Sequence, residues 1–247
     1  MQEALTGKVA LITGAAQRVG AVIAETLHQQ GMRLIVHYRS SKHAAHTLQE
    51  RLNAVRPQSV ALVQADLLDV AKVTRMVQES VNIWGRLDAV INNASSFYPT
   101  PVGSVSETQW DDLMGTNLKA PFFVAQAAAR ALTERQGCII NITDIHGERP
   151  LKSYPVYSAA KAGLIMLTQA LARELGPHVR VNGIAPGAVL WPENMDEVTK
   201  QRIISRITLK RPGQPRDVAQ TALFLLRDAD YITGQIIAVD GGRSISS

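Results

Sequence analysis

The stretch Val9-Ala-Leu-Ile-Thr-Gly-Ala-Ala-Gln-Arg-Val-Gly20 decides the fold that we expect for this chain. Four apolar residues form a candidate buried strand, which runs into a turn with glycines at positions 14 and 20 and then into a helical pattern. Gly14 permits a tight turn, Gly20 permits close helix packing, and the free N–H groups at the helix start favour a phosphate. The usual middle glycine is replaced by Arg18, whose guanidinium could grip a diphosphate or a ribose phosphate. The motif is therefore incomplete. Its two glycines alone do not identify a phosphate site, because any strand-to-helix turn can carry two glycines.

Short apolar runs and longer helical patterns alternate along the rest of the chain. Continuous apolar strands that alternate with helices indicate a parallel sheet covered on both faces, because right-handed crossovers place helices there. We therefore predict an α/β fold, a single-domain Rossmann-type doubly wound parallel sheet of about seven strands, spanning residues 1–247. Its ligands should lie beyond the carboxyl ends of the strands. The expected strands are 9–12, 33–37, 60–64, 89–91, 138–142, 179–184 and 235–239, and the expected helices are 17–30, 41–55, 71–84, 107–132, 154–175 and 216–227.

The composition is that of an ordinary folded protein. Hydrophobic residues make up 46% and charged residues 19% of the 247 residues, which argues against disorder. The net charge of +5 comes from scattered basic residues, which indicates a mild attraction for anionic ligands and is only weak evidence for nucleic-acid binding. The single Cys138 cannot form an internal disulfide, and no apolar run approaches the roughly 20 residues of a membrane helix. We expect a cytoplasmic protein with no membrane or nucleic-acid partner and no metal site.

The end of the second expected strand bears on the choice of cofactor. It reads Tyr38-Arg-Ser40, at a place where a site for the ribose 2′-hydroxyl would carry an acidic residue. An arginine accommodates a 2′-phosphate instead, so Arg39 and Ser40 favour NADPH over NADH. The alternative is that Arg39 is an ordinary surface arginine and that Ser41 caps the next helix.

Three polar or aromatic positions lie after strands or within a helix. Asp66, with Leu67, could flank an adenine edge or could cap the next helix. Phe97 follows the fourth strand in a proline-rich stretch, where it could stack on a flat ring or pack under its own loop. Asn117 lies in the helix expected at 107–132, where a kink at Pro121 should turn the Asn117 amide toward buried backbone or water.

The stretch from Asp144 to Lys161 places a carboxyl, a phenol and an ammonium in one short span. Tyr157 and Lys161 are four residues apart in an expected helix, so they should lie on one face. A lysine beside a phenol favours the phenolate, which makes Tyr157 the candidate general acid. Asp144 should lie at the exit of the strand at 138–142, facing the start of that helix. The alternative is an exposed Tyr-x-x-x-Lys pair that arose by chance.

The segment at 188–212 is long for a connection between the last crossovers, and it contains Trp191 and a charged, helix-like run. Its length favours a lid over the substrate. Leu190 begins the pocket wall that this segment would form.

Taken together, the motifs resemble those of the short-chain dehydrogenase/reductase family over essentially the whole chain. Residues 13–20, 92–94, 117, 157–161, 182–187 and 240–242 follow the family's order and spacing. Three positions depart from its pattern: Arg18 replaces the middle glycine, Ser95 replaces the glycine usual after Asn-Asn-Ala, and Asp144 replaces the serine usual thirteen residues before the tyrosine. These departures, and the stretch at 92–101, resemble the pteridine reductase branch.

The resemblance implies hydride transfer from NADPH to a dihydropterin or dihydrofolate ring stacked between Phe97 and the nicotinamide. It also implies proton delivery by Tyr157 with Asp144, a nicotinamide-ribose contact at Lys161, a water relay at Asn117, and a homotetramer assembled through the fourth and fifth helices. A carboxyl that can carry a proton suits ring nitrogens better than a serine hydroxyl does.

The residues expected to act fall into three groups. The catalytic residues are Asn117, Asp144, Tyr157 and Lys161. The cofactor-binding residues are Gly14, Arg18, Val19, Tyr38, Arg39, Ser40, Asp66, Leu67, Asn93, Ala94, Ser95, Thr143, Tyr157, Lys161, Pro186 and Gly187. The substrate-binding residues are Arg18, Ser95, Phe97, Asp144, Tyr157, Leu190 and Trp191.

Two alternatives to a pterin reductase stay open. The first is a carbonyl reductase acting on a ketone such as a 3-ketoacyl thioester, although an ionised Asp144 would repel the charge that develops on a ketone oxygen. The second is a non-catalytic protein that senses NADP(H), against which the intact set of Asn117, Tyr157 and Lys161 argues.

Overall fold

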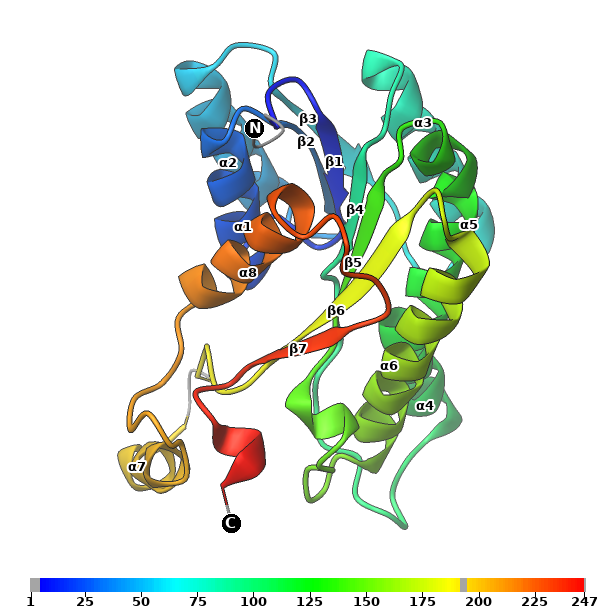
Figure 1. The fold of residues 1–247 in the computed structure, drawn as a ribbon. Coiled ribbons are helices and arrows are strands. Elements are labelled where there is room, and N and C mark those ends of the chain that lie inside the picture. The colour runs from blue at the N-terminus through cyan, green and yellow to red at the C-terminus, as the bar shows by residue number, and fades with distance from the viewer. Residues whose placement is uncertain (1–4, 192–194, 247) are drawn as a thin grey trace.

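A seven-stranded parallel sheet forms the centre of the protein (Figure 1). The computed structural model describes residues 5–191 and 195–246, and within them the strand order is β3-β2-β1-β4-β5-β6-β7. This arrangement confirms the predicted α/β, Rossmann-type doubly wound sheet. The strands are β1 (Val9–Ile12), β2 (Arg33–Tyr38), β3 (Val60–Gln64), β4 (Ala89–Asn92), β5 (Cys138–Ile142), β6 (Arg180–Pro186) and β7 (Ile236–Val239).

Helices cover both faces of the sheet (Figure 1). One layer consists of α1 (Arg18–Gln29), α2 (Lys42–Val55) and α8 (Pro215–Arg227), and the other contains α3 (Val70–Trp84), α5 (Ala120–Thr133) and α6 (Pro155–Leu175). Each layer buries its own apolar cluster, around Leu27 and Leu223 on one face and around Leu132 and Ile139 on the other. Burial on both faces explains why the central strands read as unbroken apolar runs.

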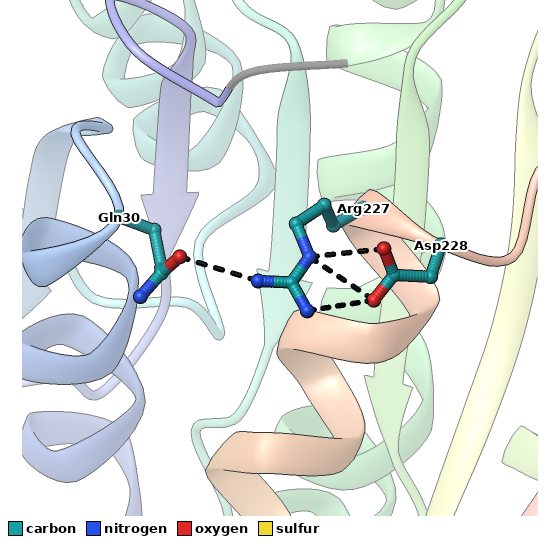
Figure 2. Close-up of polar contacts among 3 residues, drawn as sticks. All are labelled: Gln30, Arg227 and Asp228. Carbon is teal, nitrogen blue, oxygen red and sulfur yellow. Dashed lines mark hydrogen bonds and ion pairs between the residues drawn. The ribbon is translucent and has the colours of Figure 1, made fainter. Parts of the chain in front are cut away.

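The ends of α1 and α8 are joined by polar contacts at the surface (Figure 2). Arg227, the last residue of α8, donates from Nη1 to Gln30 Oε1 at 3.2 Å. Its Nη2 atom lies 2.8 Å from Asp228 Oδ2. Exposed ion pairs stabilise little, so the packing of α8 on α1 depends mainly on their buried apolar faces. This packing supports α1, whose first turn faces the ligand site described below.

The helix predicted at 107–132 is interrupted just before the expected place. It consists of α4 (Glu107–Met114), a π-helical turn (Gly115–Lys119) and α5. The break predicted at Pro121 was wrong, because Pro121 lies within the first turn of α5. Since helical backbone continues into α5 from the preceding turn, the missing N–H of Pro121 leaves the carbonyl of Asn117, four residues earlier, without its usual partner. The π-helical turn supplies the interruption instead, and such turns are frequent at functional sites.

The segment at 188–212 contains α7 (Glu197–Ser205). In Figure 1 this helix lies close to the C-terminal turn, the short helical turn Arg243–Ile245. Residues 192–194 of the expected lid lie outside the described residues. Closure of this segment, and the organisation of the chain as one domain, stay predictions. None of the helices in the described part of the chain has the length and apolar character needed to cross a membrane.

Candidate active site

The turn from β1 into α1 is built against the end of β4. Gly14 has φ +61°, and a Cβ there would lie 2.9 Å from Ala94 Cα. A Cβ at Gly20 would lie 2.5 Å from Asn93 Nδ2, which donates to Thr13 O at 2.9 Å and to Gly14 O at 3.0 Å. Both glycines are therefore required by close contacts, and the packing of Asn93 against Gly20 was not predicted from the sequence.

The start of α1 is suited to an anion. Its N-cap residue, Gln17, forms no side-chain cap hydrogen bond, and no acidic residue lies in the first turn of the helix. Arg18 stands there with φ +56°, and its side chain has no hydrogen bond or ion pair with any described residue. Free N–H groups, the positive end of the helix dipole and an unpaired guanidinium all favour a phosphate group.

His37, at the end of β2, connects the glycine-rich turn to the end of β3. Its Nδ1 accepts a hydrogen bond from Gly14 N at 3.0 Å, so its Nε2 carries the proton and donates to Ala65 O at 3.1 Å. Burial lowers the pKa of His37 to about 4, so the imidazole is neutral at pH 7. The sequence analysis missed this residue. A lone histidine in an apolar strand beside the turn was the available signal.

The two residues after His37 differ in exposure. Tyr38 is buried, whereas Arg39 is exposed and its guanidinium has no partner among the described residues. Asp66, at the end of the next strand, accepts a hydrogen bond from Leu68 N at 3.1 Å. The alternative that Asp66 caps the next helix was wrong, because the N-cap of α3 is Asp69, whose side chain accepts from Ala71 N and Lys72 N. Asp66 lines the cavity.

The Asp144 carboxyl and the Tyr157 phenol meet in a partly buried hydrogen bond. The Tyr157 hydroxyl donates to Asp144 Oδ2 at 2.7 Å, and Asp144 Oδ1 accepts from His146 N at 2.8 Å. Lys161 Nζ donates to Ile142 O at 2.8 Å and lies 5.7 Å from the centroid of the Tyr157 ring. Tyr157 and Lys161 are 4% and 2% exposed, so they are not a chance surface pair.

The protonation of this cluster differs from the sequence-based expectation. Burial raises the pKa of Tyr157 well above its ordinary value, and the Asp144 carboxylate raises it further, while the Ser95 hydroxyl offsets a part. Burial lowers the pKa of Lys161 to about 8, against the opposing effect of Asp144. The expected phenolate is therefore wrong for the structure as it stands. The phenol keeps its proton because it is desolvated beside an anion and because Lys161 points to a backbone carbonyl.

Asn117 lies in the π-helical turn, behind the loop that follows β4. Its Oδ1 accepts a hydrogen bond from Ser95 Oγ at 2.6 Å, and its Nδ2 donates to Ser96 O and Leu113 O, both at 2.9 Å. The prediction that its amide turns toward buried backbone is confirmed. Its use as a water relay stays a prediction.

Phe97 both packs and lines the site. Its ring stacks on Tyr154 at a centroid distance of 4.7 Å and meets the edge of Tyr157 at 4.8 Å. The side chain remains 48% exposed. The Phe97 ring therefore packs against neighbouring aromatic side chains, and its stacking on a flat ligand ring stays a prediction.

A cavity of about 950 Å³ joins these parts. It is lined by all the predicted cofactor-binding and substrate-binding residues, from Gly14 and Arg18 to Leu190 and Trp191. Asn117 lies outside this lining. The glycine cradle, the free helix N-terminus and the unpaired arginines fit a dinucleotide. Lining residues that the sequence analysis did not single out include His37, Met195, Thr199, Arg202, Ile203, Arg206 and Arg243.

A doubly wound sheet whose first turn can hold a diphosphate, facing a buried tyrosine and lysine, is the architecture of NAD(P)-dependent oxidoreductases. Sequence comparison narrows this class, since the family model described as enoyl-(acyl carrier protein) reductase matches residues 14–244. The chain belongs to the short-chain dehydrogenase/reductase family and is an NAD(P)-dependent oxidoreductase.

Curated relatives of two activities are equally similar to the chain. Pteridine reductase 1 of Leishmania tarentolae is 37% identical over an alignment of 282 positions, which spans 98% of each chain. The 3-oxoacyl-(acyl-carrier-protein) reductase of Staphylococcus aureus strain Mu50 is 37% identical over 240 residues, 95% of this chain and 97% of the relative. The corresponding reductase of Thermotoga maritima is 34% identical over 246 residues, 98% and 99% of the two chains. Identity alone does not choose between these substrates, and the choice depends on the site.

Proposed function

We propose that this protein is an NADPH-dependent reductase that transfers a hydride to the pterin ring of a dihydropterin or dihydrofolate. The observation that carries the proposal is the 2.7 Å hydrogen bond from the Tyr157 hydroxyl to Asp144 Oδ2. It is supported by the similarity to pteridine reductase 1 and by the position of Phe97 beside the catalytic tyrosine.

The pair suits a ring nitrogen as the proton acceptor. Tyr157 is held in its neutral form, so it has a proton to give, and Asp144 is placed to take part in replacing that proton. A ketone substrate sets a different demand, because a carboxylate beside the developing alkoxide repels it. The same carboxylate can accept hydrogen bonds from the N–H donors of a pterin.

The cofactor would lie along the glycine-rich turn. NADPH supplies the hydride when it is bound. Arg18 and the start of α1 bind its diphosphate in this proposal, and Arg39 with Ser40 binds its 2′-phosphate, because an unpaired guanidinium there replaces the acid that reads a 2′-hydroxyl. Lys161 would bind the nicotinamide ribose.

The pterin ring would lie between the nicotinamide and Phe97. The exposed part of the Phe97 ring offers a flat apolar surface, and its contact with Tyr154 holds it in place. Leu190 and Trp191 line the same cavity and would form the outer wall. Asn117, bonded to Ser95, would support the loop that carries Phe97.

Steady-state oxidation of NADPH tests this proposal with three substrates: dihydrobiopterin, dihydrofolate and an acetoacetyl thioester. Turnover of a dihydropterin without turnover of the thioester supports it. The reverse result identifies a 3-ketoacyl reductase, for which the similarity to the Staphylococcus aureus enzyme is the favouring observation. Binding of NADPH with no turnover of any of the three would indicate the cofactor-sensing protein.

We also propose a homotetramer in which α4, α5 and α6 form a contact surface. Three large apolar side chains on these helices are exposed: Trp110 by 48%, Phe122 by 37% and Met166 by 63%. Light scattering should give the mass of four chains for the wild-type protein and a lower mass for Phe122→Glu. A monomer in the wild type would contradict the proposal.

A further inference from the structure

Three arginines line the cavity on the side of α7 and the C-terminal turn. Arg202 lies on α7, Arg206 follows that helix, and Arg243 begins the short helical turn Arg243–Ile245. Arg202 and Arg206 are exposed, and Arg243 is partly buried. Their guanidinium groups form no hydrogen bond or ion pair with any described residue. Unpaired cations grouped on one wall of a cavity attract a ligand of opposite charge.

Hydrogen bonds hold the two segments that carry Arg206 and Arg243 together. Leu209 N donates to Gly241 O at 3.0 Å, and Thr208 Oγ1 donates to Gly242 O at 3.0 Å. Gly242 has φ +82°, and a Cβ there would lie 2.7 Å from Thr208 Oγ1. The proximity of the two arginines is therefore built into the fold.

Nearby acids compensate this charge only in part. Asp240 Oδ1 accepts from Gly242 N at 2.9 Å and Asp240 Oδ2 accepts from Ser244 N at 2.6 Å, so both oxygens are used by the turn itself. Burial and the charge of Arg206 lower the pKa of Arg243, while Asp144 and Asp240 act in the opposite direction. Arg243 lines the same cavity as Asp144.

The cavity wall carries more basic side chains than the phosphates of the cofactor would contact. Its described lining carries seven basic side chains, namely Arg18, Arg39, Lys152, Lys161, Arg202, Arg206 and Arg243, and two acidic ones, Asp66 and Asp144. In the proposed complex the phosphates of NADPH meet Arg18 and Arg39, which follow β1 and β2, whereas α7 and Arg243 follow β6 and β7 on the other side of the sheet. The cations beside α7 are then left for a second anion.

We infer that Arg206 and Arg243, with Arg202 at the rim, bind an anionic substituent that the substrate carries on its pterin ring. A guanidinium binds a carboxylate or a phosphate ester through paired N–H donors, so the glutamyl tail of dihydrofolate and a phosphorylated side chain share the required chemistry. Arg243 then determines specificity without taking part in the chemical step. The inference rests on the proposed function and adds to it the charge of the preferred substrate.

Two substrate pairs test the inference by steady-state kinetics with NADPH: dihydrofolate against dihydrobiopterin, and dihydroneopterin phosphate against dihydroneopterin. Arg243→Leu and Arg206→Leu should raise KM for an anionic member at least about tenfold, since a charge-assisted pair is lost. KM for the neutral members, kcat, and Kd for NADPH should stay within about twofold. The anionic substrate with the larger change identifies the source of the anion.

Two further variants control the comparison. Arg243→Lys keeps the charge and should retain part of the preference for the anionic substrate. Arg75→Leu removes an exposed arginine of α3 that does not line the cavity, and it should change no kinetic constant. Normal NADPH binding by Arg243→Leu shows that the variant is folded.

Three results would overturn the inference. Equal changes in KM for neutral and anionic substrates would contradict the inference but not the proposed pterin reductase activity. A weaker Kd for NADPH would assign the arginines to the cofactor. If the wild-type protein reduces none of the four pterins, the proposed function fails and the inference fails with it.

Discussion

The Tyr157 hydroxyl donates a hydrogen bond to Asp144 Oδ2 at 2.7 Å, and this contact joins the end of β5 to the first turn of α6. Burial and the neighbouring carboxylate keep the phenol protonated. A proton is thus held beside the place where the reacting ring would lie. The proposed chemistry depends on this pair more than on any other contact.

Replacing Tyr157 with phenylalanine removes the hydroxyl and little else. We expect kcat for a dihydropterin to fall about 10²- to 10⁴-fold, the usual contribution of general acid catalysis, with Kd for NADPH within about twofold of wild type. Steady-state kinetics measure kcat, and fluorescence titration with NADPH measures Kd. Loss of NADPH binding would show that Tyr157 serves the cofactor and not the proton.

Arg39→Ala tests the choice of cofactor. The exposed guanidinium has no partner within the described structure, so its removal should leave stability unchanged and weaken NADPH binding about tenfold or more. NADH binding should change by less than about twofold, because NADH lacks the 2′-phosphate. An equal loss for both cofactors would contradict the role given to Arg39.

His37→Leu tests the connection between β2, the glycine-rich turn and β3. The variant leaves the Gly14 N–H and the Ala65 carbonyl without their partner, and it should lower the free energy of unfolding by about 2 to 4 kcal/mol. His43→Leu on the exposed surface of α2 is the matched control, with an expected change within about 0.5 kcal/mol. Urea denaturation measures both, and equal values would remove His37 from this role.

The pKa of His37 also predicts a dependence of stability on pH. The folded-state pKa is about 4, below the unfolded value of about 6.5. As the pH falls from 6.5 to 4, the unfolded chain takes up a proton that the folded protein does not, so stability should fall by up to about 3 kcal/mol through this group. Urea denaturation at pH 7.0 and 4.5 should show a smaller fall for His37→Leu than for wild type. An equal fall would place the titration elsewhere.

Much of the fold could be predicted because the central strands are buried on both faces. The strands expected at 9–12, 60–64 and 138–142 match β1, β3 and β5, and the others differ by one or two residues. The π-helical turn could not be read from the sequence, because Pro121 gave a stronger signal for a break than Gly115 did. The helix α7 buries none of its residues, so its amphipathic pattern was too weak to define its ends.

The candidate site was predictable where its residues follow strands. Asp144 lies after β5, Arg39 after β2 and Gly14 after β1, and parallel strands bring these ends to one edge of the sheet. The direction in which the pKa of Tyr157 shifts was not predictable, because it depends on burial and on which side chain reaches the hydroxyl. The proximity of Arg206 to Arg243 was not predictable either, because it depends on tertiary contacts between two segments far apart in the chain.

The most direct test of the account is the ratio of kcat/KM for dihydrobiopterin to kcat/KM for an acetoacetyl thioester, measured with NADPH in wild type and in Asp144→Ser. The substitution removes the carboxylate and supplies the neutral hydroxyl that a ketone oxygen favours. We predict a ratio far above one in wild type that falls at least about a hundredfold in Asp144→Ser. A wild-type ratio below one, or a ratio that the substitution leaves unchanged, would contradict the assignment of Asp144 and Tyr157 to a pterin.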